Sequence, residues 1–274
     1  MKKKLIAIAA AALMVVALAG CSSSSSSSSS SASASASASA SASTATEMKL
    51  VTPGTITVGT SPDYPPFENL EGNDIVGFEV DLVNAVAGKL GMKVEYKAMN
   101  FDSIIAAVEA GTQIDLGMSG FTITPERAKT IDFTTSFYTD DLGIATMNNG
   151  AFTSEDALAA DGVRIAVQSG TTGESAMKEN YPKAEVTSYT SSNDIFAALS
   201  AGKADAACTN ISVVNAMLTE SYNDCSVIKK ISSGEDYGLV VAKGNPVLTQ
   251  KINAALADLE KDGTIANLLA KWNL

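Results

Sequence analysis

From residue 47 onward, short apolar runs alternate with amphipathic stretches. Apolar or alternating runs of five or six residues predict strands, and apolar positions repeated on one face predict helices. Two of these helices are each followed by a glycine, Gly91 or Gly111, which is typical of a helix end. The strands predicted in this first half are residues 55–60, 92–97 and 114–118. The helices predicted between them are residues 79–90 and 101–110.

A second series of the same kind starts near residue 150. Its predicted strands are residues 163–167, 185–189, 204–208 and 237–242. Its predicted helices are residues 172–180, 193–201, a helix reaching about residue 219, and two terminal helices around 252–259 and 265–272. This alternation predicts an α/β fold with largely parallel sheets. Residues 101–115 and 193–205 resemble each other, which favours two lobes built on the same arrangement.

The first 46 residues have a different pattern. Three lysines precede an apolar run at residues 5–20, which is too short for a membrane span. With Leu18–Cys21 at its end, this segment resembles a bacterial lipoprotein signal, so we expect residues 1–20 to be cleaved and Cys21 to carry lipid. An uncleaved anchor or an ordinary secretory signal remains open. Residues 21–46 are almost entirely serine and alanine, which predicts a disordered tether.

Composition excludes several kinds of function. The 274 residues include 19 Lys and Arg, 30 Asp and Glu and no histidine, for a net charge of −11. Without histidine there is no Ser–His–Asp triad and no histidine metal site, and we expect neither metal nor cofactor. The negative charge disfavours nucleic acid as a partner. Export would permit a disulfide between Cys208 and Cys225. Cys208 lies in an apolar stretch, so a buried free thiol is equally open.

A series of motifs carries a specific resemblance. They are TSPDYPPF at 60–67, GFEVDL at 77–82, FDSII at 101–105, SGFTITPER at 119–127, IDF at 131–133, QSGTT at 168–172, AGKADA at 201–206 and DGT at 262–264. In this order they resemble the polar amino-acid-binding proteins of bacterial ABC importers, the extracellular solute-binding proteins of family 3. The resemblance extends over roughly residues 48–274.

The resemblance implies a two-lobed periplasmic-binding-protein fold of type II, with two sheets flanked by helices and joined by a two-strand hinge. Lobe 1 would be residues 47–136 plus 238–274, and lobe 2 residues 142–232. Residues 137–141 and 233–237 would form the hinge, and the ligand would lie in the cleft between the lobes.

Ligand-contacting positions follow from the same resemblance, and each has a chemical reason. The planar fork of Arg127 suits a carboxylate. Ser119, Gly120 and Thr122 follow a predicted strand, and strand ends are where α/β folds place ligands. Tyr64 and Phe101 would enclose the ligand side chain. The second lobe would contribute Gln168, Thr171 and Thr172, at a predicted helix start that favours anions.

One position departs from the family pattern. Where relatives carry an aspartate for the ligand ammonium, this chain has Asn210. An amide oxygen accepts a hydrogen bond but supplies no charge, so another carboxylate would have to help. Asp63 and Asp141 are candidates, as is Asp140, and Ser61 stands where relatives with cationic ligands carry an acid. We therefore list Ser61, Asp63 and Asp141 as further ligand side-chain contacts.

These observations predict a non-enzymatic binding protein. It would be exported and lipid-anchored to the outer face of the cell membrane, or on the periplasmic side in a Gram-negative cell. A monomer would capture a polar amino acid and deliver it to an ABC permease with its ATPase. The alternatives are a binder of a small carboxylate without an amine, and a cyclic-carboxylate dehydratase or sensor domain on the same fold.

Overall fold

The structure, a computed structural model, describes residues 47–274. The predicted signal peptide at residues 1–20, the lipidated Cys21 and the tether at 21–46 lie outside the described residues. No helix within residues 47–274 has the length and apolar character that a membrane crossing needs.

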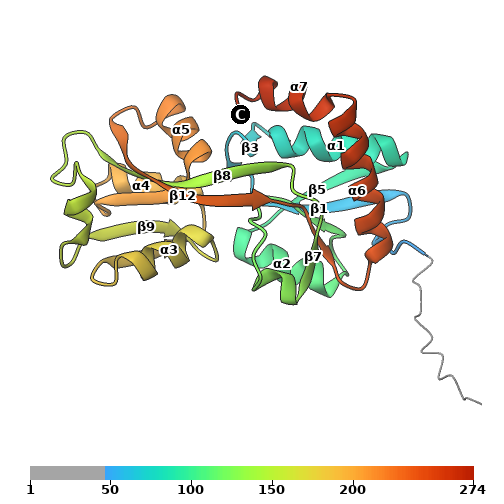
Figure 1. Cartoon of the computed structure of the whole chain (residues 1–274), viewed down its shortest axis with the longest axis horizontal. Coiled ribbons are helices and arrows are strands. Elements are labelled where there is room, and N and C mark those ends of the chain that lie inside the picture. Colours follow the sequence, from blue (N-terminus) through green and yellow to red (C-terminus); the bar gives the residue numbers. More distant parts are fainter. Residues whose placement is uncertain (1–46) are drawn as a thin grey trace, which may run out of the picture. The chain divides into compact units, whose positions relative to one another are not determined.

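The first lobe contains a five-stranded sheet in the order β5-β1-β6-β13-β7. Its strands are β1 (Thr55–Thr60), β5 (Lys93–Ala98), β6 (Leu116–Gly117), β7 (Ile131–Phe133) and β13 (Val240–Ala242). Its helices are α1 (Phe78–Leu90), α2 (Phe101–Ala110), α6 (Pro246–Lys261) and α7 (Thr264–Lys271). Helices α1, α6 and α7 pack on one another, while α2 packs separately on the sheet (Figure 1). We call this unit lobe 1.

The second lobe has its own five-stranded sheet in the order β10-β9-β11-β8-β12. Its strands are β8 (Tyr138–Met147), β9 (Arg164–Gln168), β10 (Glu185–Tyr189), β11 (Ala206–Asn210) and β12 (Cys225–Tyr237). Its helices are α3 (Thr172–Asn180), α4 (Ser192–Ser200) and α5 (Ile211–Glu220), with a short 3-10 turn at Glu155–Ala159. We call this unit lobe 2.

Helix α2 illustrates why the sequence folds in this way. Phe101, Ile104 and Val108 recur at helical spacing, and all three are buried. Gly111 ends the helix in a left-handed conformation with φ 59°, and its N–H donates to the carbonyls of the last turn. A residue with a side chain is strained at such a φ, so the glycine determines where the helix stops.

Strands β8 and β12 form a long antiparallel ribbon that runs from lobe 2 toward lobe 1 (Figure 1). The two segments expected to form the hinge pair with each other at the lobe 1 end of this ribbon. There Glu235 lies opposite Asp140, and Tyr237 lies opposite Tyr138. The chain crosses between the lobes twice at this point. Glu235, on the second crossing, accepts hydrogen bonds from Thr122 and from Thr172.

The structure corrects several details of the sequence prediction. The sheets are mixed rather than largely parallel, because β13 runs antiparallel to β6 and β7, and β8 runs antiparallel to β11 and β12. The strand expected at 237–242 is split between β12 and β13. A small antiparallel sheet was not predicted, and it consists of β2 (Asp63–Tyr64), β3 (Glu68–Glu71) and β4 (Asp74–Val76).

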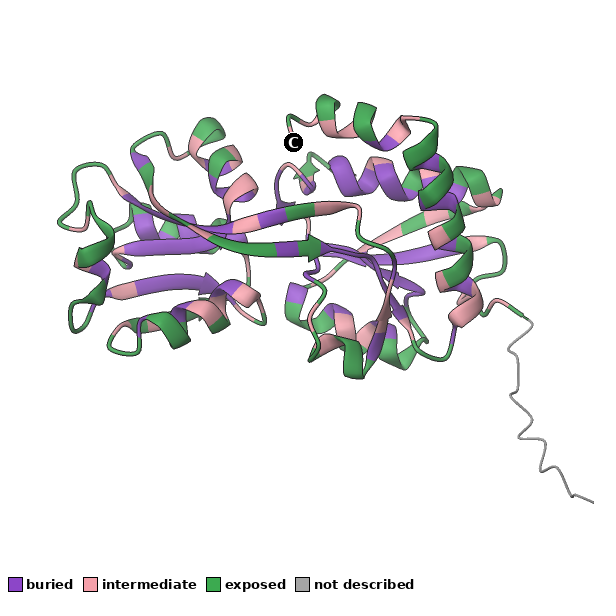
Figure 2. Cartoon of the chain, viewed as in Figure 1, coloured by how far each residue is buried: buried purple, intermediate pink, exposed green. Residues whose placement is uncertain are grey.

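The inner strands form the core of each lobe. Strand β11 is buried along its whole length, and so is β1 apart from Thr55 (Figure 2). Outer strands such as β5 and β10 alternate between covered and exposed positions. The continuous apolar runs therefore come from strands with helices on both sides, as expected for the parallel part of an α/β sheet.

Of the two states left open for Cys208 and Cys225, the structure has the free thiols. Cys208 lies on β11 opposite Ile144, and Cys225 lies on β12 opposite Met147. Strand β8 therefore separates the two cysteines, which puts their Cα atoms more than about 10 Å apart, beyond the reach of a disulfide. Both cysteines are buried free thiols.

Candidate functional site

All ten residues predicted to contact the ligand surround one cavity between the lobes. The first group comes from lobe 1: Tyr64, Phe101, Ser119, Gly120, Thr122 and Arg127. The second group comes from lobe 2: Gln168, Thr171, Thr172 and Asn210. The cavity measures only about 10 Å³, because side chains from the two lobes meet across it.

Arg127 offers a guanidinium to this cavity. It begins a single 3-10 turn, Arg127–Lys129. Its guanidinium carbon lies 5.6 Å from the ring centre of Phe101 and 5.4 Å from that of Phe121. Its Nη1 donates to the carbonyl of Thr122 at 2.9 Å, and its Nη2 donates to that of Gly170, in lobe 2, at 3.0 Å.

The charge of Arg127 has no direct partner in the described part of the chain, where it forms no ion pair with an acid. Burial lowers its pKa from the usual value, and the negative charge of Glu235 acts in the opposite direction. Since two carbonyls use only part of the five-donor fork, N–H groups remain for an anion.

The loop after β6 brings backbone groups to the cavity. Gly120 has φ +55°, and a Cβ atom there would lie 2.6 Å from a ring carbon of Tyr64, so only glycine fits. Ser119 has the unusual φ of 150°, and its Oγ accepts a hydrogen bond from the N–H of Ser61 at 2.9 Å. The N–H of Gly120 donates to Glu79 Oε1 at 3.1 Å. The loop is therefore held by hydrogen bonds to Ser61, directly after β1, and to Glu79 of α1.

Glu79, which holds the loop at Gly120, is one of two buried carboxyl groups that lie together. Glu68 and Glu79 are 0% and 1% exposed. Both oxygens of Glu68 and one of Glu79 have no hydrogen-bond partner among the described residues. Burial raises the pKa of Glu79 to about 7 and that of Glu68 well above its usual range, and repulsion from Glu79 adds to the latter shift. At least one proton therefore resides on this pair near neutral pH.

Helix α3 presents its N-terminus to the cavity from lobe 2. Thr171 caps it by accepting the N–H of Glu174 at 3.1 Å, and its hydroxyl donates to the carbonyl of Gln168 at 2.7 Å. Thr172 directs its hydroxyl to Glu235 at 2.9 Å. This N-terminus thus has an ordinary threonine cap, and the hydroxyl of the following residue, Thr172, is bound to Glu235 beside the cavity.

Sequence reasoning missed Glu235. Its side chain is 5% exposed, and its Oε2 accepts hydrogen bonds from Thr122 Oγ1 at 2.7 Å, Thr172 Oγ1 at 2.9 Å and Asn210 Nδ2 at 2.9 Å. These three donors all line the cavity. The polar sequence around Glu235 gave no signal for this: Glu235 and Tyr237 are buried on one face of β12, while Asp236 between them is exposed, only because β12 pairs with β8.

Asn210 joins Glu235 to the opposite lobe. Its Oδ1 accepts a hydrogen bond from the hydroxyl of Tyr64, in lobe 1. Its Nδ2 donates to Glu235, and because an ionised carboxylate cannot donate, the amide orientation is determined by both partners. The hydroxyl oxygens of Tyr64 and Tyr237 lie 3.4 Å apart. Burial raises the pKa of both tyrosines, so both hydroxyls stay protonated and can donate.

The structure places Ser61, Asp63 and Asp141 outside the cavity. Asp63 accepts from Ser61 Oγ at 2.7 Å within lobe 1 and from the N–H of Ser192 at 2.5 Å in lobe 2. Asp141 lies on β8, where it accepts from the N–H of Gly234 at 2.9 Å and pairs with Lys230 at 3.0 Å. The groups that were candidates to support Asn210 therefore have other partners.

Asp140, the remaining candidate, lies below the cavity. Its Oδ1 accepts the N–H of Asp141 at 2.8 Å, and its Oδ2 accepts the N–H of Ser212 at 3.3 Å near the start of α5. Tyr237 donates to it at 3.5 Å. Burial raises the pKa of Asp140. Its contacts hold strand β8 to the start of α5.

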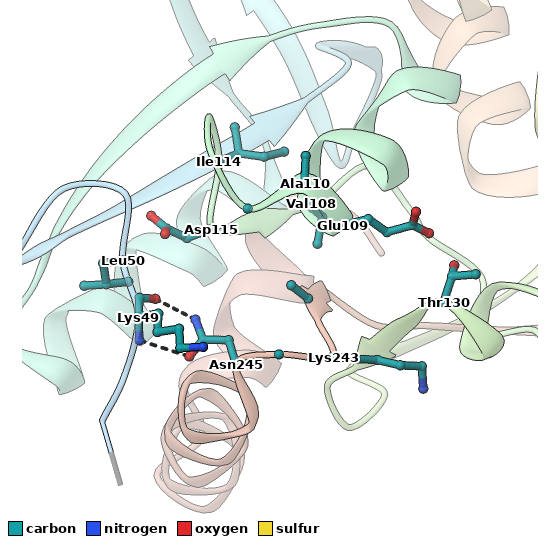
Figure 3. A pocket seen from close by; sticks show the side chains of 13 residues that line it. Lys49, Leu50, Val108, Glu109, Ala110, Ile114, Asp115, Thr130, Lys243 and Asn245 are labelled. Atoms are coloured by element: carbon teal, nitrogen blue, oxygen red, sulfur yellow. Dashed lines mark hydrogen bonds between the residues drawn. The ribbon is translucent and has the colours of Figure 1, made fainter. Parts of the chain in front are cut away.

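A larger hollow of about 460 Å³ lies on lobe 1, away from the cleft (Figure 3). Its polar groups already have partners. Asn245 donates to the carbonyl of Lys49 at 2.6 Å and accepts its N–H at 3.2 Å, and Asp115 accepts the N–H groups of Val51 and Thr57. These contacts anchor the first described residues to lobe 1, so we do not take this hollow as the functional site.

Within residues 47–274, no group of three or more Cys, Asp or Glu side chains is arranged to hold a metal ion. The chemistry of the cleft therefore rests on hydroxyls, amides, aromatic rings and the two charges of Arg127 and Glu235.

Comparisons with known proteins identify the fold and the family. The chain is similar to a solved structure described as "An ancestral arginine-binding protein bound to glutamine", with 37% identity, a TM-score of 0.76, and coverage of 81% of this chain and 98% of that one. It is also similar to "the ancestral amino acid-binding protein AncCDT-1, a precursor of cyclohexadienyl dehydratase", with 36% identity, a TM-score of 0.74, and coverage of 80% and 95%. The two-lobed fold is that of type II periplasmic binding proteins.

Sequence comparison agrees with this. The arginine-binding extracellular protein ArtP of Bacillus subtilis (strain 168) is 32% identical over 220 residues, which cover 79% of this chain and 85% of the relative. Residues 56–274 match the family described as bacterial extracellular solute-binding proteins, family 3. On this evidence the chain belongs to the bacterial extracellular solute-binding proteins of family 3.

Proposed function

We propose that this chain captures a polar amino acid in the cleft between its lobes and delivers it to an ABC importer. It would do so without catalysis, as an exported monomer attached through lipid on Cys21 to the outer face of the membrane, or on the periplasmic side in a Gram-negative cell. An ABC permease and its ATPase would supply the energy for transport.

The observation that carries this proposal is the guanidinium of Arg127. It faces the cavity and packs against two aromatic rings, and its N–H groups donate hydrogen bonds only to carbonyl oxygens. A partly buried cation without an anionic partner is unfavourable, and a ligand carboxylate supplies that partner with bidentate geometry. The side chains of Ser119, Thr122 and Thr172 surround the same space, where the hydroxyls of the two threonines donate to Glu235.

The small cavity supports a capture mechanism that involves hinge motion. Pockets that hold small ligands are about 300–1,000 Å³ in volume, far above the roughly 10 Å³ between the lobes here. An amino acid can therefore enter only when the lobes separate, and the β8–β12 ribbon is where such a rotation would occur. Closure then buries the ligand, and the closed form is what a permease would recognise.

The proposal is tested with purified protein that has been unfolded and refolded to remove carried ligand. Thermal unfolding is measured with each of the twenty L-amino acids and with the matching carboxylic acids that lack the amine. A ligand at 100 times its Kd adds ~2.7 kcal/mol, which raises the Tm by roughly 5–10 °C. If only amine-free carboxylates raise the Tm, the ligand class is wrong and the carboxylate alternative applies.

A further inference from the structure

Glu235 is a carboxylate directly behind residues that line the cavity, and it has no cationic partner among the described residues. It is 5% exposed, and no described lysine or arginine forms an ion pair with it. Only neutral groups, two hydroxyls and one amide, donate to its Oε2. None of the described residues donates to its Oε1. Since a buried charge needs compensation, this second oxygen is free for a cation brought by a ligand.

The three donors fix where this carboxylate lies. Thr122 belongs to lobe 1, whereas Thr172 and Asn210 belong to lobe 2, and each lines the cavity. Glu235 itself comes from the ribbon that connects the lobes. Its contacts with both lobes therefore exist together only when the cleft is closed, which is also when a ligand would be enclosed.

Asn210 has a definite role in this arrangement. Its amide donates to Glu235 at 2.9 Å, and its oxygen is already engaged by Tyr64. An aspartate at position 210 would put a second carboxylate at that short distance, where two like charges cannot both remain ionised. The amide instead stabilises the negative charge of Glu235. The carboxylate that relatives carry at position 210 is thus replaced here by Glu235 on β12, which accepts a hydrogen bond from Asn210.

From this geometry we propose that Glu235, rather than residue 210, binds the α-ammonium group of the ligand. The inference rests on the proposed function, since it requires an amino-acid ligand. Arg127 would hold the carboxylate and Glu235 the ammonium, so the two ends of a zwitterion meet opposite charges. Asn210 acts as a positioning residue that holds the side chain of Glu235 in place through its amide.

The test compares Glu235→Gln, the double variant Glu235→Gln with Asn210→Asp, and a control, Asp236→Asn. The control removes the same charge from the next residue of the strand, whose side chain is exposed and accepts from Thr139 at 2.5 Å. Binding is measured by calorimetry with each of the twenty L-amino acids that binds the wild type, and with its amine-free counterpart.

We expect Glu235→Gln to weaken amino-acid binding roughly 10- to 100-fold, the value of a charge-assisted hydrogen bond. Binding of the amine-free counterpart should change by less than about threefold on the same scale, which also shows that the variant folds. The double variant moves the carboxylate to position 210, with the amide introduced at position 235 as its donor, and should recover most of the amino-acid affinity. The control should bind like the wild type.

The results separate the two proposals. If the wild type binds no L-amino acid, the proposed function fails and this inference fails with it. If the wild type binds amino acids and Glu235→Gln loses both ligand classes equally, Glu235 only shapes the cleft and the inference alone is wrong. A double variant as weak as the single variant would equally overturn it, since charge would then not be what matters.

Discussion

The carboxylate of Asp63 in lobe 1 accepts the backbone N–H of Ser192, the first residue of α4 in lobe 2, at 2.5 Å. Negative charge is favourable at a helix N-terminus, where N–H groups lack partners within the helix. Ser61 holds the other carboxylate oxygen at 2.7 Å, and Gln168 of lobe 2 approaches at 3.4 Å. This contact joins the lobes at the edge of the cleft, so it stabilises the closed form.

Asp63→Asn should therefore weaken ligand binding by roughly tenfold, because a charge-assisted contact present only in the closed form is reduced to a neutral one. Calorimetry gives the affinity, and small-angle scattering at a fixed ligand concentration gives the radius of gyration, which should increase. Asp258→Asn, an exposed position on α6, is the matched control for loss of charge. An unchanged affinity and radius would mean that the contact does not influence closure.

Arg127→Ala should cost ~2–4 kcal/mol of ligand affinity, because the ligand carboxylate would be buried without its partner. Arg127→Lys keeps the charge but lacks the bidentate fork, so its affinity should lie between those of wild type and Arg127→Ala. Calorimetry with the amino acid found in the screen measures both. A loss below tenfold for Arg127→Ala would exclude Arg127 from the ligand contacts.

Periodic patterns predicted most of the helices and the inner strands. The bounds of α2 and α3 and of strands β1 and β10 agree with the sequence prediction at both ends. Helix α2 has an apolar face and ends at Gly111, α3 starts after the capping Thr171, β1 is a buried run, and β10 alternates between partly covered and exposed positions. These are local signals, and local signals are what sequence periodicity reports.

The ribbon and Glu235 could not be predicted in the same way. Strand β12 contains the polar run SSGEDY, which on its own is typical of an exposed loop. Its extended form is stabilised by pairing with β8, some ninety residues earlier in the chain, and this register decides which side chains face the cleft. Asp63 was predicted to contact the ligand because the sequence shows its charge. The sequence does not show that the N–H of Ser192 already binds this carboxylate.

Gly120→Ala should destabilise the protein by roughly 1–3 kcal/mol and displace Tyr64, because the added Cβ would lie 2.6 Å from its ring and φ is +55°. Gly91→Ala is the control, since Gly91 has a similar φ of +66° but nothing within 4 Å of the added carbon. Urea unfolding of both variants separates the backbone strain from the collision. Equal losses of stability would show that contact with Tyr64 contributes nothing.

The two cysteines should remain free thiols without reductant. Cys208 and Cys225 are 1% and 5% exposed, and burial raises their pKa to about 12 and about 11, so reactive thiolate is scarce in the folded protein. A maleimide should label neither in the native protein and both after unfolding in the absence of reductant, as read by peptide mapping. A crosslinked peptide containing both residues would contradict the strand order described above.

Stability should decrease as pH rises from about 5 to 8, and Glu68 and Glu79 should be the cause. The unfolded chain loses these protons near the ordinary glutamate pKa of about 4.3. The folded chain retains them longer, because burial raises the pKa of Glu79 to about 7 and raises that of Glu68 well above its usual range. Between these values the folded state holds more protons than the unfolded state, so the free energy of unfolding falls with rising pH, by on the order of 3 kcal/mol.

Burial also raises the pKa of Asp63 and that of Asp140, and these two groups act in the same direction, so a variant is needed to isolate the glutamate pair. The chain has no histidine, and lowered pKa values, such as that of Asp262 at about 2, act only at more acidic pH. In Glu68→Gln, the amide can donate to Glu79 and remove the repulsion, so this variant should be more stable than the wild type at pH 8 and should depend less steeply on pH. Urea unfolding at pH 5, 6, 7 and 8 measures both slopes, with Glu71→Gln, on the exposed end of the same strand, as control. If Glu68→Gln keeps the wild-type slope, the buried pair does not hold the proton, and the support of Gly120 by Glu79 must then involve an ionised carboxylate.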